Sequence, residues 1–136
     1  MAKRGTLEHP KTLALADKLG IMDPWALGLL EAFWNWVARY HPDGDVSGTK
    51  PSMLARSIRY TGDAEELWAA LQDCNSPASS FIDKLEDDRM LVHGWSEHAD
   101  DAVRKRLLRQ GDNFADGSEP YARKQGQRRD KRATKV

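Results

Sequence analysis

The sequence predicts a mainly α-helical fold that carries a small two-stranded β-wing. A long apolar stretch, residues 24–40, has the composition of a central helix, and the short segment DGDVSG that follows it suits a strand. Two shorter helical patterns and a hairpin pattern come next, before Trp95. This order of helix, strand, helix, helix and hairpin is that of a winged helix-turn-helix, a fold that is most often used to hold nucleic acid.

The first element is an expected extra N-terminal helix over residues 11–19. Leu13, Ala16 and Leu19 recur there at helical spacing. Gly20 follows directly and is suited to the left-handed conformation that ends many helices. The pattern therefore predicts a short helix in front of the apolar one.

The apolar helix is expected to begin at Asp23–Pro24 and to end near Tyr40. Aspartate is a favourable N-cap, and proline suits the first helical position. Apolar side chains occur on most faces of this helix, so we expect it to be the central one, packed on several sides. They are Leu27, Leu30, Trp34 and Val37 on one side, and Leu29, Phe33 and Trp36 on another. The segment His41–Gly44 stops the helix.

A first strand is expected at residues 45–47, followed by two short helices separated by a turn. Residues 50–52 begin the first helix, whose inward side chains are Leu54, Ala55 and Ile58. Residues 61–63 form the turn, and Asp63 is suited to cap the second helix, which extends to about residue 73. The strongest periodic signal in the chain lies in this second helix and consists of Ala64, Leu67, Trp68 and Leu71.

The remaining pattern predicts a loop, a hairpin, a C-terminal helix and a tail. Residues 75–80 have loop composition, and two strands, 81–84 and 90–95, flank a polar turn. Ser96 is suited to cap a last helix that reaches Leu107 or Leu108. Few apolar residues follow Gly111. We therefore expect a winged-helix domain over residues 1–110 and a flexible basic tail over residues 111–136.

The composition indicates a compact cytoplasmic protein. Hydrophobic residues make up 40% of the 136 residues and charged residues 31%, which suits a packed domain rather than a disordered chain. No apolar run approaches the roughly 18 residues that span a membrane, and the first residues do not resemble a signal peptide. Cys74 is the single cysteine and cannot form an internal disulfide. The five tryptophans are expected in the core.

The formal net charge of zero conceals an asymmetry along the chain. Residues 1–95 contain ten Lys and Arg against fourteen Asp and Glu, whereas residues 96–136 contain eleven against seven. A basic C-terminal region of this kind is typical of chains that meet a polyanion or an acidic partner.

Several local patterns, taken in order, resemble a known family. They are His9–Leu13 with Leu19–Ile21, the tryptophan-rich helix, the segment Pro42–Gly48, and Leu91–Trp95. Over residues 9–110 the set resembles the N-terminal winged-helix domain of phage and prophage replication proteins of the replisome-organiser or helicase-loader type. The resemblance implies a domain that binds origin DNA. In that family a separate C-terminal region contacts the helicase, and this sequence shows no folded region after residue 110 that matches it.

The second helix of a helix-turn-helix normally lies in the major groove, yet here that helix is acidic. Residues 63–74 contain Asp63, Glu65, Glu66 and Asp73 but no lysine or arginine. Gln72 is the one side chain in it of a type that commonly reads bases. The sequence therefore argues against ordinary base recognition by this helix, which also reads as a packing helix with a solvated acidic face.

Basic side chains elsewhere are better candidates for contact with DNA phosphates. Those of the helix-turn-helix and the wing are Lys50, Arg56, Arg59, Lys84 and Arg89. Those at the end of the last helix are Arg104, Lys105, Arg106 and Arg109, where cations are also favourable without any ligand. Those of the tail are Arg123, Lys124, Arg128, Arg129, Lys131 and Arg132. The alternative for each set is ordinary solvated surface charge.

The sequence gives little support for catalysis, so we expect a non-enzymatic protein. The four histidines lack the partners and spacing of a zinc site, and neither a phosphate-binding glycine loop nor a nucleophile motif is present. No cofactor and no metal are expected. The leading hypothesis is a DNA-binding protein of replication initiation whose partner is double-stranded DNA. The alternatives are an adaptor that binds a replication protein or a second copy of itself, and a dimeric transcriptional regulator.

Overall fold

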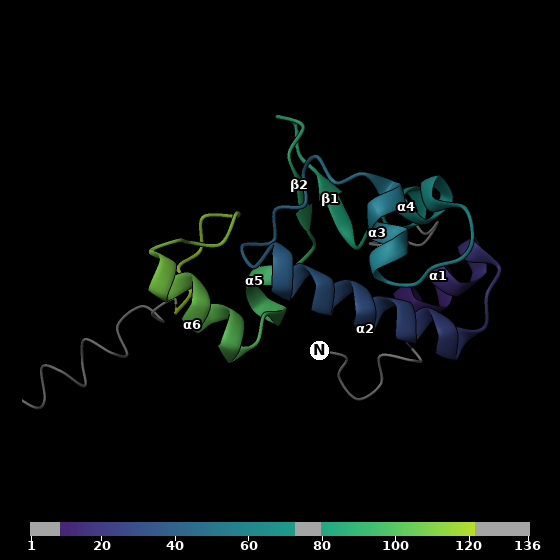
Figure 1. Cartoon of the computed structure of the whole chain (residues 1–136), viewed down its shortest axis with the longest axis horizontal. Helices are drawn as coiled ribbons and strands as arrows, with labels where there is room; N and C mark the ends of the chain where they lie inside the picture. The colour runs from purple at the N-terminus through teal and green to yellow at the C-terminus, as the bar shows by residue number, and fades with distance from the viewer. Residues whose placement is uncertain (1–8, 73–79, 122–136) are drawn as a thin grey trace, which may run out of the picture.

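The structure, a computed structural model, describes residues 9–72 and 80–121. Over these residues the fold is mainly helical, with one small antiparallel sheet of two strands (Figure 1). The helices are α1 (Pro10–Leu19), α2 (Asp23–Tyr40), α3 (Pro51–Ser57), α4 (Ala64–Gln72), α5 (Trp95–His98) and α6 (Asp101–Gln110), and the strands are β1 (Ile82–Lys84) and β2 (Met90–Val92). Within these ranges, no helix has both the length and the hydrophobicity to cross a membrane.

Helix α2 runs along the length of the molecule and organises the other elements around it (Figure 1). Helices α1, α3 and α4 lie towards one end of it, α6 lies at the opposite end, and the hairpin rises between them. Helix α1 packs against both α2 and α4, while α4 also packs against α3 and β1. The prediction of a helix packed on several sides is confirmed only in part, because α2 packs chiefly against α1 among the elements and its buried residues follow one face.

Helix α1 has the predicted end, and only part of the predicted apolar spacing is buried. Gly20 ends it in the left-handed conformation, with φ of 65°. Thr12, Leu15 and Ala16 are its buried residues, whereas Leu13 is 40% exposed. Of the residues whose spacing predicted the helix, Ala16 is buried and Leu13 is exposed, because α1 turns the side that carries Thr12 and Leu15 towards the core.

The start of α2 lies one residue away from the predicted cap. Met22 occupies the N-cap position without a side-chain hydrogen bond, and Asp23 is already the first helical residue. Aspartate is still favourable there because its charge lies at the positive end of the helix dipole. The buried residues of α2 are Ala26, Leu29, Leu30, Phe33 and Val37.

Helices α3 and α4 form the predicted helical pair. Leu54, Ala55 and Ile58 are buried, as expected. The carboxylate Oδ1 of Asp63 accepts hydrogen bonds from the backbone N–H groups of Glu65 and Glu66 at 2.8 and 3.1 Å, so the predicted cap of α4 is confirmed.

The predicted hairpin is confirmed, although its second strand ends at Val92 rather than at residue 95, where α5 begins. The predicted strand at residues 45–47 is reduced to a single bridge. β1 and β2 pair antiparallel, with Asp83 opposite Leu91. Asp45 bridges Leu91 from the other side of β2. Val46 N–H donates to the Met90 carbonyl at 2.8 Å, and a turn then takes the chain away towards α3. The turn leaves too few consecutive residues beside β2 to form a strand.

The C-terminal region departs from the prediction in two ways. The expected single helix is two helices, because the chain breaks at Ala99 and Asp100, and Asp100 rather than Ser96 caps α6. The flexible tail was expected from residue 111, but residues 111–121 pack against the body: Phe114 is only 3% exposed, and Ala115 N–H donates to the Asp43 carbonyl at 2.8 Å. A buried aromatic side chain and hydrogen bonds to the body together hold this segment of otherwise polar composition.

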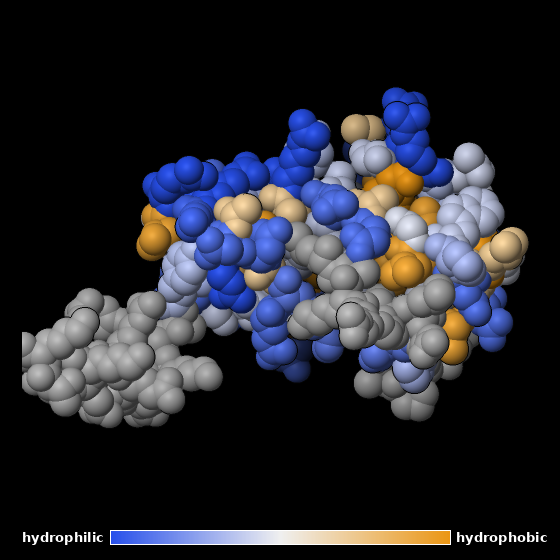
Figure 2. All heavy atoms as spheres, turned by 90° about the horizontal axis from the view of Figure 1, so that it is seen from below, coloured by the Kyte–Doolittle hydropathy of each residue, from blue (hydrophilic) through white to orange (hydrophobic). Residues whose placement is uncertain are grey.

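The tryptophans are less deeply buried than the sequence suggested. Trp95 is buried, and its indole N–H donates to the Pro42 carbonyl at 2.8 Å. Trp34, Trp36 and Trp68 are half-buried, and Trp25 is 47% exposed. Viewed from below, hydrophobic side chains reach the surface mainly at the end that carries α1, α3 and α4, while the end that carries α6 is mainly hydrophilic (Figure 2). Cys74 and most of the predicted loop at residues 75–80 lie outside the described residues.

Candidate nucleic-acid interface

Three exposed cations surround α3. Lys50 directly precedes the helix, Arg56 lies in its last turn, and Arg59 lies in the turn that leads to α4. The described parts of the chain give none of these three side chains an ion-pair partner. They are therefore available to an anion outside the protein, as predicted contacts to phosphate require.

Arg59 occupies an unusual backbone conformation. Its φ is 63°, in the left-handed region that costs a non-glycine residue roughly 1–2 kcal/mol. The conformation lets the chain reverse, so that Tyr60 N–H donates to the Ala55 carbonyl at 2.8 Å and closes the end of α3. The turn thus places a cation at a backbone position that only glycine adopts without strain.

The same turn holds a half-buried tyrosine. The pKa of Tyr60 is raised by burial first, and then by the negative charges of Glu66 and Asp63. A Cβ atom at Gly62 would lie 2.5 Å from the Tyr60 hydroxyl, so only glycine leaves room for this ring. The Tyr60 ring consequently lies against Gly62 in the turn between α3 and α4.

Helix α4 presents an acidic surface. Glu65 and Glu66 are exposed in its first turn. Gln72, the one candidate base-reading side chain of this helix, donates from Nε2 to the Trp68 carbonyl at 3.3 Å. The amide is therefore engaged inside the helix, and the described part of α4 offers carboxylates rather than donors to a bound polyanion.

The cations of the hairpin are paired with its own acids. Lys84 Nζ lies 3.9 Å from Asp88 Oδ1, and Arg89 Nε lies 2.8 Å from Asp87 Oδ2. The backbone N–H of Arg89, and then its side chain, hold the pKa of Asp87 below its usual value. Arg89 also donates to the Ala115 carbonyl at 3.2 Å. Lys84 and Arg89, the two predicted phosphate contacts of the wing, are thus already paired with acids of the same hairpin.

Arg104 of α6 has structural partners that the sequence did not reveal. Arg104 donates to the carbonyls of Ser96, Ala99 and Pro120 at 2.6, 3.2 and 2.8 Å, and its guanidinium lies 5.4 Å from the centre of the Phe114 ring. This arginine ties α5, α6 and the C-terminal segment together. The predicted phosphate contact at Arg104 thus falls on a side chain that already has four structural contacts.

The other cations of α6 differ among themselves. Arg106 donates to the Arg39 carbonyl at 2.7 Å and so closes the end of α2. Lys105 pairs with Asp101 at 3.1 Å, whereas Arg109 is exposed in the last turn. The predicted tail contacts lie outside the described residues: Arg123, Lys124, Arg128, Arg129, Lys131 and Arg132.

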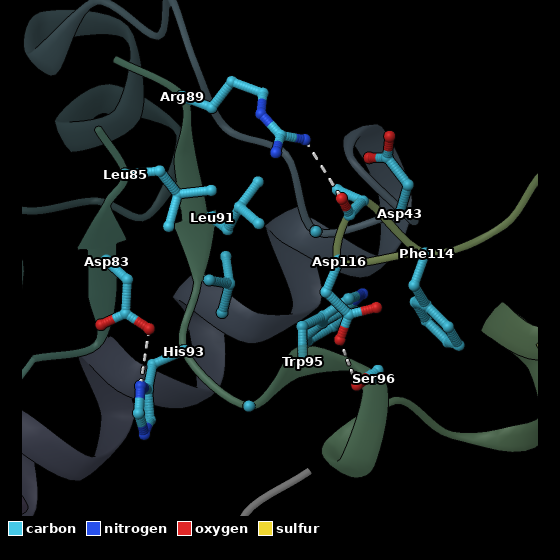
Figure 3. Close-up of a pocket in the computed structure, with 14 residues that line it drawn as sticks. Asp43, Asp83, Leu85, Arg89, Leu91, His93, Trp95, Ser96, Phe114 and Asp116 are labelled. Carbon is cyan, nitrogen blue, oxygen red and sulfur yellow. Dashed lines mark hydrogen bonds and ion pairs between the residues drawn. The ribbon is translucent and has the colours of Figure 1, made fainter. Parts of the chain in front are cut away.

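A pocket of about 370 Å³ lies between the hairpin, α5 and the C-terminal segment (Figure 3). Figure 3 shows two separate hydrogen-bonded pairs beside it: His93 Nδ1 with Asp83 Oδ2 at 2.7 Å, and Ser96 Oγ donating to Asp116 Oδ2 at 2.7 Å. Burial acts to raise the pKa of Asp116, but hydrogen bonds from Ser96 and Ser118 outweigh it and lower that pKa.

This pocket suits neither phosphate nor the catalytic chemistry of a paired serine and histidine. Besides His93, its charged lining consists of three aspartates and one arginine. The excess of carboxylates would repel an anion such as phosphate. Its hydroxyl and its imidazole each bond to a different carboxylate rather than to each other. Among residues 9–72 and 80–121, no three His, Cys, Asp or Glu side chains are grouped so as to hold a metal ion.

No protein-family model matches the chain, and searches of curated proteins and of solved structures find no match.

Proposed function

We propose that this chain is a non-enzymatic, DNA-binding winged helix-turn-helix protein of the replication-initiator class of phages and prophages. In this proposal α3 and α4 are the helix-turn-helix, and β1 and β2 are the wing. The order of the elements and the bridge between Asp45 and Leu91 beside the hairpin support it. So do the local patterns by which residues 9–110 resemble that family.

The single observation that carries the proposal is the set of three exposed cations around α3 that have no ion-pair partner among residues 9–72 and 80–121. In helix-turn-helix proteins the first helix of the pair crosses the DNA backbone, and the proposal assigns that role to α3. Lys50, Arg56 and Arg59 then meet phosphates, while the acidic α4 is unsuited to base edges. We therefore propose binding that depends on salt and only weakly on DNA sequence.

The basic residues of the tail add to this binding in the proposal. A dense run of cations neutralises phosphates without reading bases, and each contact releases condensed counterions. Deletion of residues 122–136 is expected to weaken binding at every salt concentration while leaving the packed segment up to Tyr121 intact.

The test is fluorescence anisotropy of a labelled duplex of random sequence with the full chain at 50 mM salt. We expect binding, and we expect the combined substitution Lys50→Ala, Arg56→Ala and Arg59→Ala to weaken it at least about tenfold. Each single substitution is compared with Lys18→Ala, which removes an exposed cation from the last turn of α1. Absence of binding at low salt, or equal effects of the α3 and Lys18 substitutions, would refute the proposal.

The acidic face of α4 favours a second candidate, an adaptor that binds a protein. Glu65 and Glu66 are exposed on α4, and Met22 and Trp25 are exposed at the start of α2. A stable dimer in light scattering that ignores DNA would support this candidate. A dimeric transcriptional regulator with the same fold would instead bind one duplex sequence far more tightly than others.

A further inference from the structure

An aromatic groove lies between the end of α2 and the exposed side of α3. It has a volume of about 740 Å³, within the range of roughly 300–1,000 Å³ that ligand pockets occupy. Its walls come from three parts of the chain: the last turn of α2, the loop before α3, and one face of α3. The residues that the following argument uses are Trp36, Tyr40, His41, Lys50 and Met53.

The wall on the α2 side is aromatic and ends in an exposed ring. The Trp36 ring stacks on Phe33, with centroids 6.2 Å apart, and lies 4.6 Å from the His41 ring. Tyr40 is 60% exposed, and Met53 on the opposite wall is 56% exposed. A tryptophan packed against two neighbouring rings, an exposed tyrosine and an exposed methionine together provide apolar surfaces on two sides of a flat apolar ligand.

The charge at the groove is positive. Lys50 lines it, no carboxylate belongs to its described lining, and the Arg39 guanidinium lies 5.6 Å from the centre of the Tyr40 ring. The pocket of Figure 3 has the opposite character, with three aspartates in its lining. The groove therefore complements a ligand that joins a flat apolar group to a negative charge.

We propose that this groove binds an unstacked base of single-stranded DNA, with an adjoining phosphate near Lys50. This inference rests on the proposed function, because Lys50 is shared between the two sites. Stacking on aromatic side chains beside a cationic track is how proteins hold single strands without reading their sequence. A base within a duplex is already stacked on its neighbours, so the groove discriminates single strands from duplex.

The test compares a labelled fifteen-residue oligothymidine with a labelled duplex, using the full chain in the same anisotropy assay. Tyr40→Ala is expected to weaken oligothymidine binding roughly 5- to 100-fold and to leave duplex binding within twofold. Tyr40→Phe keeps the ring and is expected to restore binding. The matched control is Trp25→Ala, which removes another exposed aromatic side chain from the far end of α2, and circular dichroism verifies that each variant is folded.

The outcomes separate this inference from the proposed function. If the α3 substitutions weaken duplex binding while Tyr40→Ala leaves oligothymidine binding unchanged, only the groove proposal fails. If Tyr40→Ala weakens both nucleic acids equally, the groove does not discriminate and the proposal also fails. A Tyr40→Ala effect on self-association in light scattering, with no effect on oligothymidine, would assign the groove to a protein contact and overturn the proposal. Absence of binding to either nucleic acid would overturn both.

Discussion

The surroundings of α3 and the β1–β2 hairpin contain similar basic residues in very different electrostatic settings. Lys50, Arg56 and Arg59 are exposed and lack ion-pair partners within the described ranges. Lys84 and Arg89 pair with Asp88 and Asp87 on the same hairpin. A count of positive charges would treat the two regions alike.

The difference shows that a cation is a good candidate for phosphate contact only if binding does not require it to break an ion pair within the protein. A paired surface cation must break or share its existing contact, although such a pair contributes only about 0–1 kcal/mol. The neighbouring carboxylates also repel phosphate, and the hairpin carries Glu86 as well. We therefore expect α3 to dominate binding and the hairpin to contribute little.

The largest expected effect is the loss of stability on replacing Gly44, which lies beside the hairpin and against Trp95. Gly44 has φ of 91°, and a Cβ atom there would lie 2.8 Å from the Trp95 side chain. Gly44→Ala should lower the free energy of unfolding by about 2–4 kcal/mol, from backbone strain and overpacking together. Chemical denaturation measures it.

The matched control for that substitution is Gly48→Ala. Gly48 also has positive φ, at 76°, but a Cβ atom there meets nothing within 4 Å. It should cost only about 1 kcal/mol. Equal losses in the two variants would show that the contact with Trp95 is not what requires glycine at position 44.

Arg59→Gly should separate stability from binding. Glycine relaxes the left-handed backbone, so the free energy of unfolding should rise by up to about 1 kcal/mol. Loss of the cation should weaken duplex binding several-fold. Arg59→Ala serves as the control, because it removes the cation but keeps the strain. If Arg59→Gly is destabilising, or if both variants bind as wild type does, the account of this turn is wrong.

Neutralising the hairpin acids should strengthen DNA binding slightly. The combined substitution Asp87→Asn and Asp88→Asn removes two carboxylates that pair with Lys84 and Arg89, and should raise duplex affinity about threefold. Asparagine also tolerates the φ of 67° found at Asp88. Glu97→Gln with Glu119→Gln is the matched control for net charge. An equal gain in the control would mean that pairing within the hairpin is irrelevant.

The smallest expected effect is the detachment of residues 111–121 from the rest of the protein at low pH. Because the pKa of Asp116 is lower in the folded protein, its stabilising contribution is complete above the unfolded pKa and is lost as the pH falls through the folded value. The NMR signals of the Phe114 ring should therefore shift below about pH 4.

Two substitutions identify the carboxyl responsible for that transition. Asp116→Asn should abolish it. Asp101→Asn is the comparison, because Asp101 also has a lowered pKa, first from a hydrogen bond donated by Tyr121 and then from Lys105. A transition that survives Asp116→Asn would contradict the assignment.

Sequence reasoning succeeded where the determining interactions are local. Asp63 caps α4 through N–H groups two and three residues away, and Gly20 ends α1 through its own backbone conformation. The helix periodicity of Leu67 and Leu71 and the hairpin are likewise short-range features.

It failed where distant segments decide the outcome. Arg104 looks like one of a run of basic residues, but its partner at Pro120 lies sixteen residues away. The packing of Phe114 and the reduction of residues 45–47 to one bridge also depend on the three-dimensional arrangement. The pairing of Arg89 with Asp87 is different, because the two residues are only two positions apart and the sequence could have indicated it.

The most direct test of the central claim is the salt dependence of duplex binding in two variants. Each phosphate contact contributes about −0.9 to the slope of log affinity against log salt. Replacing Lys50, Arg56 and Arg59 with alanine should make that slope shallower by nearly three units, whereas Lys84→Ala with Arg89→Ala should change it by less than about half a unit. Equal slopes in the two variants, or a larger change in the hairpin variant, would contradict the assignment of the interface to α3.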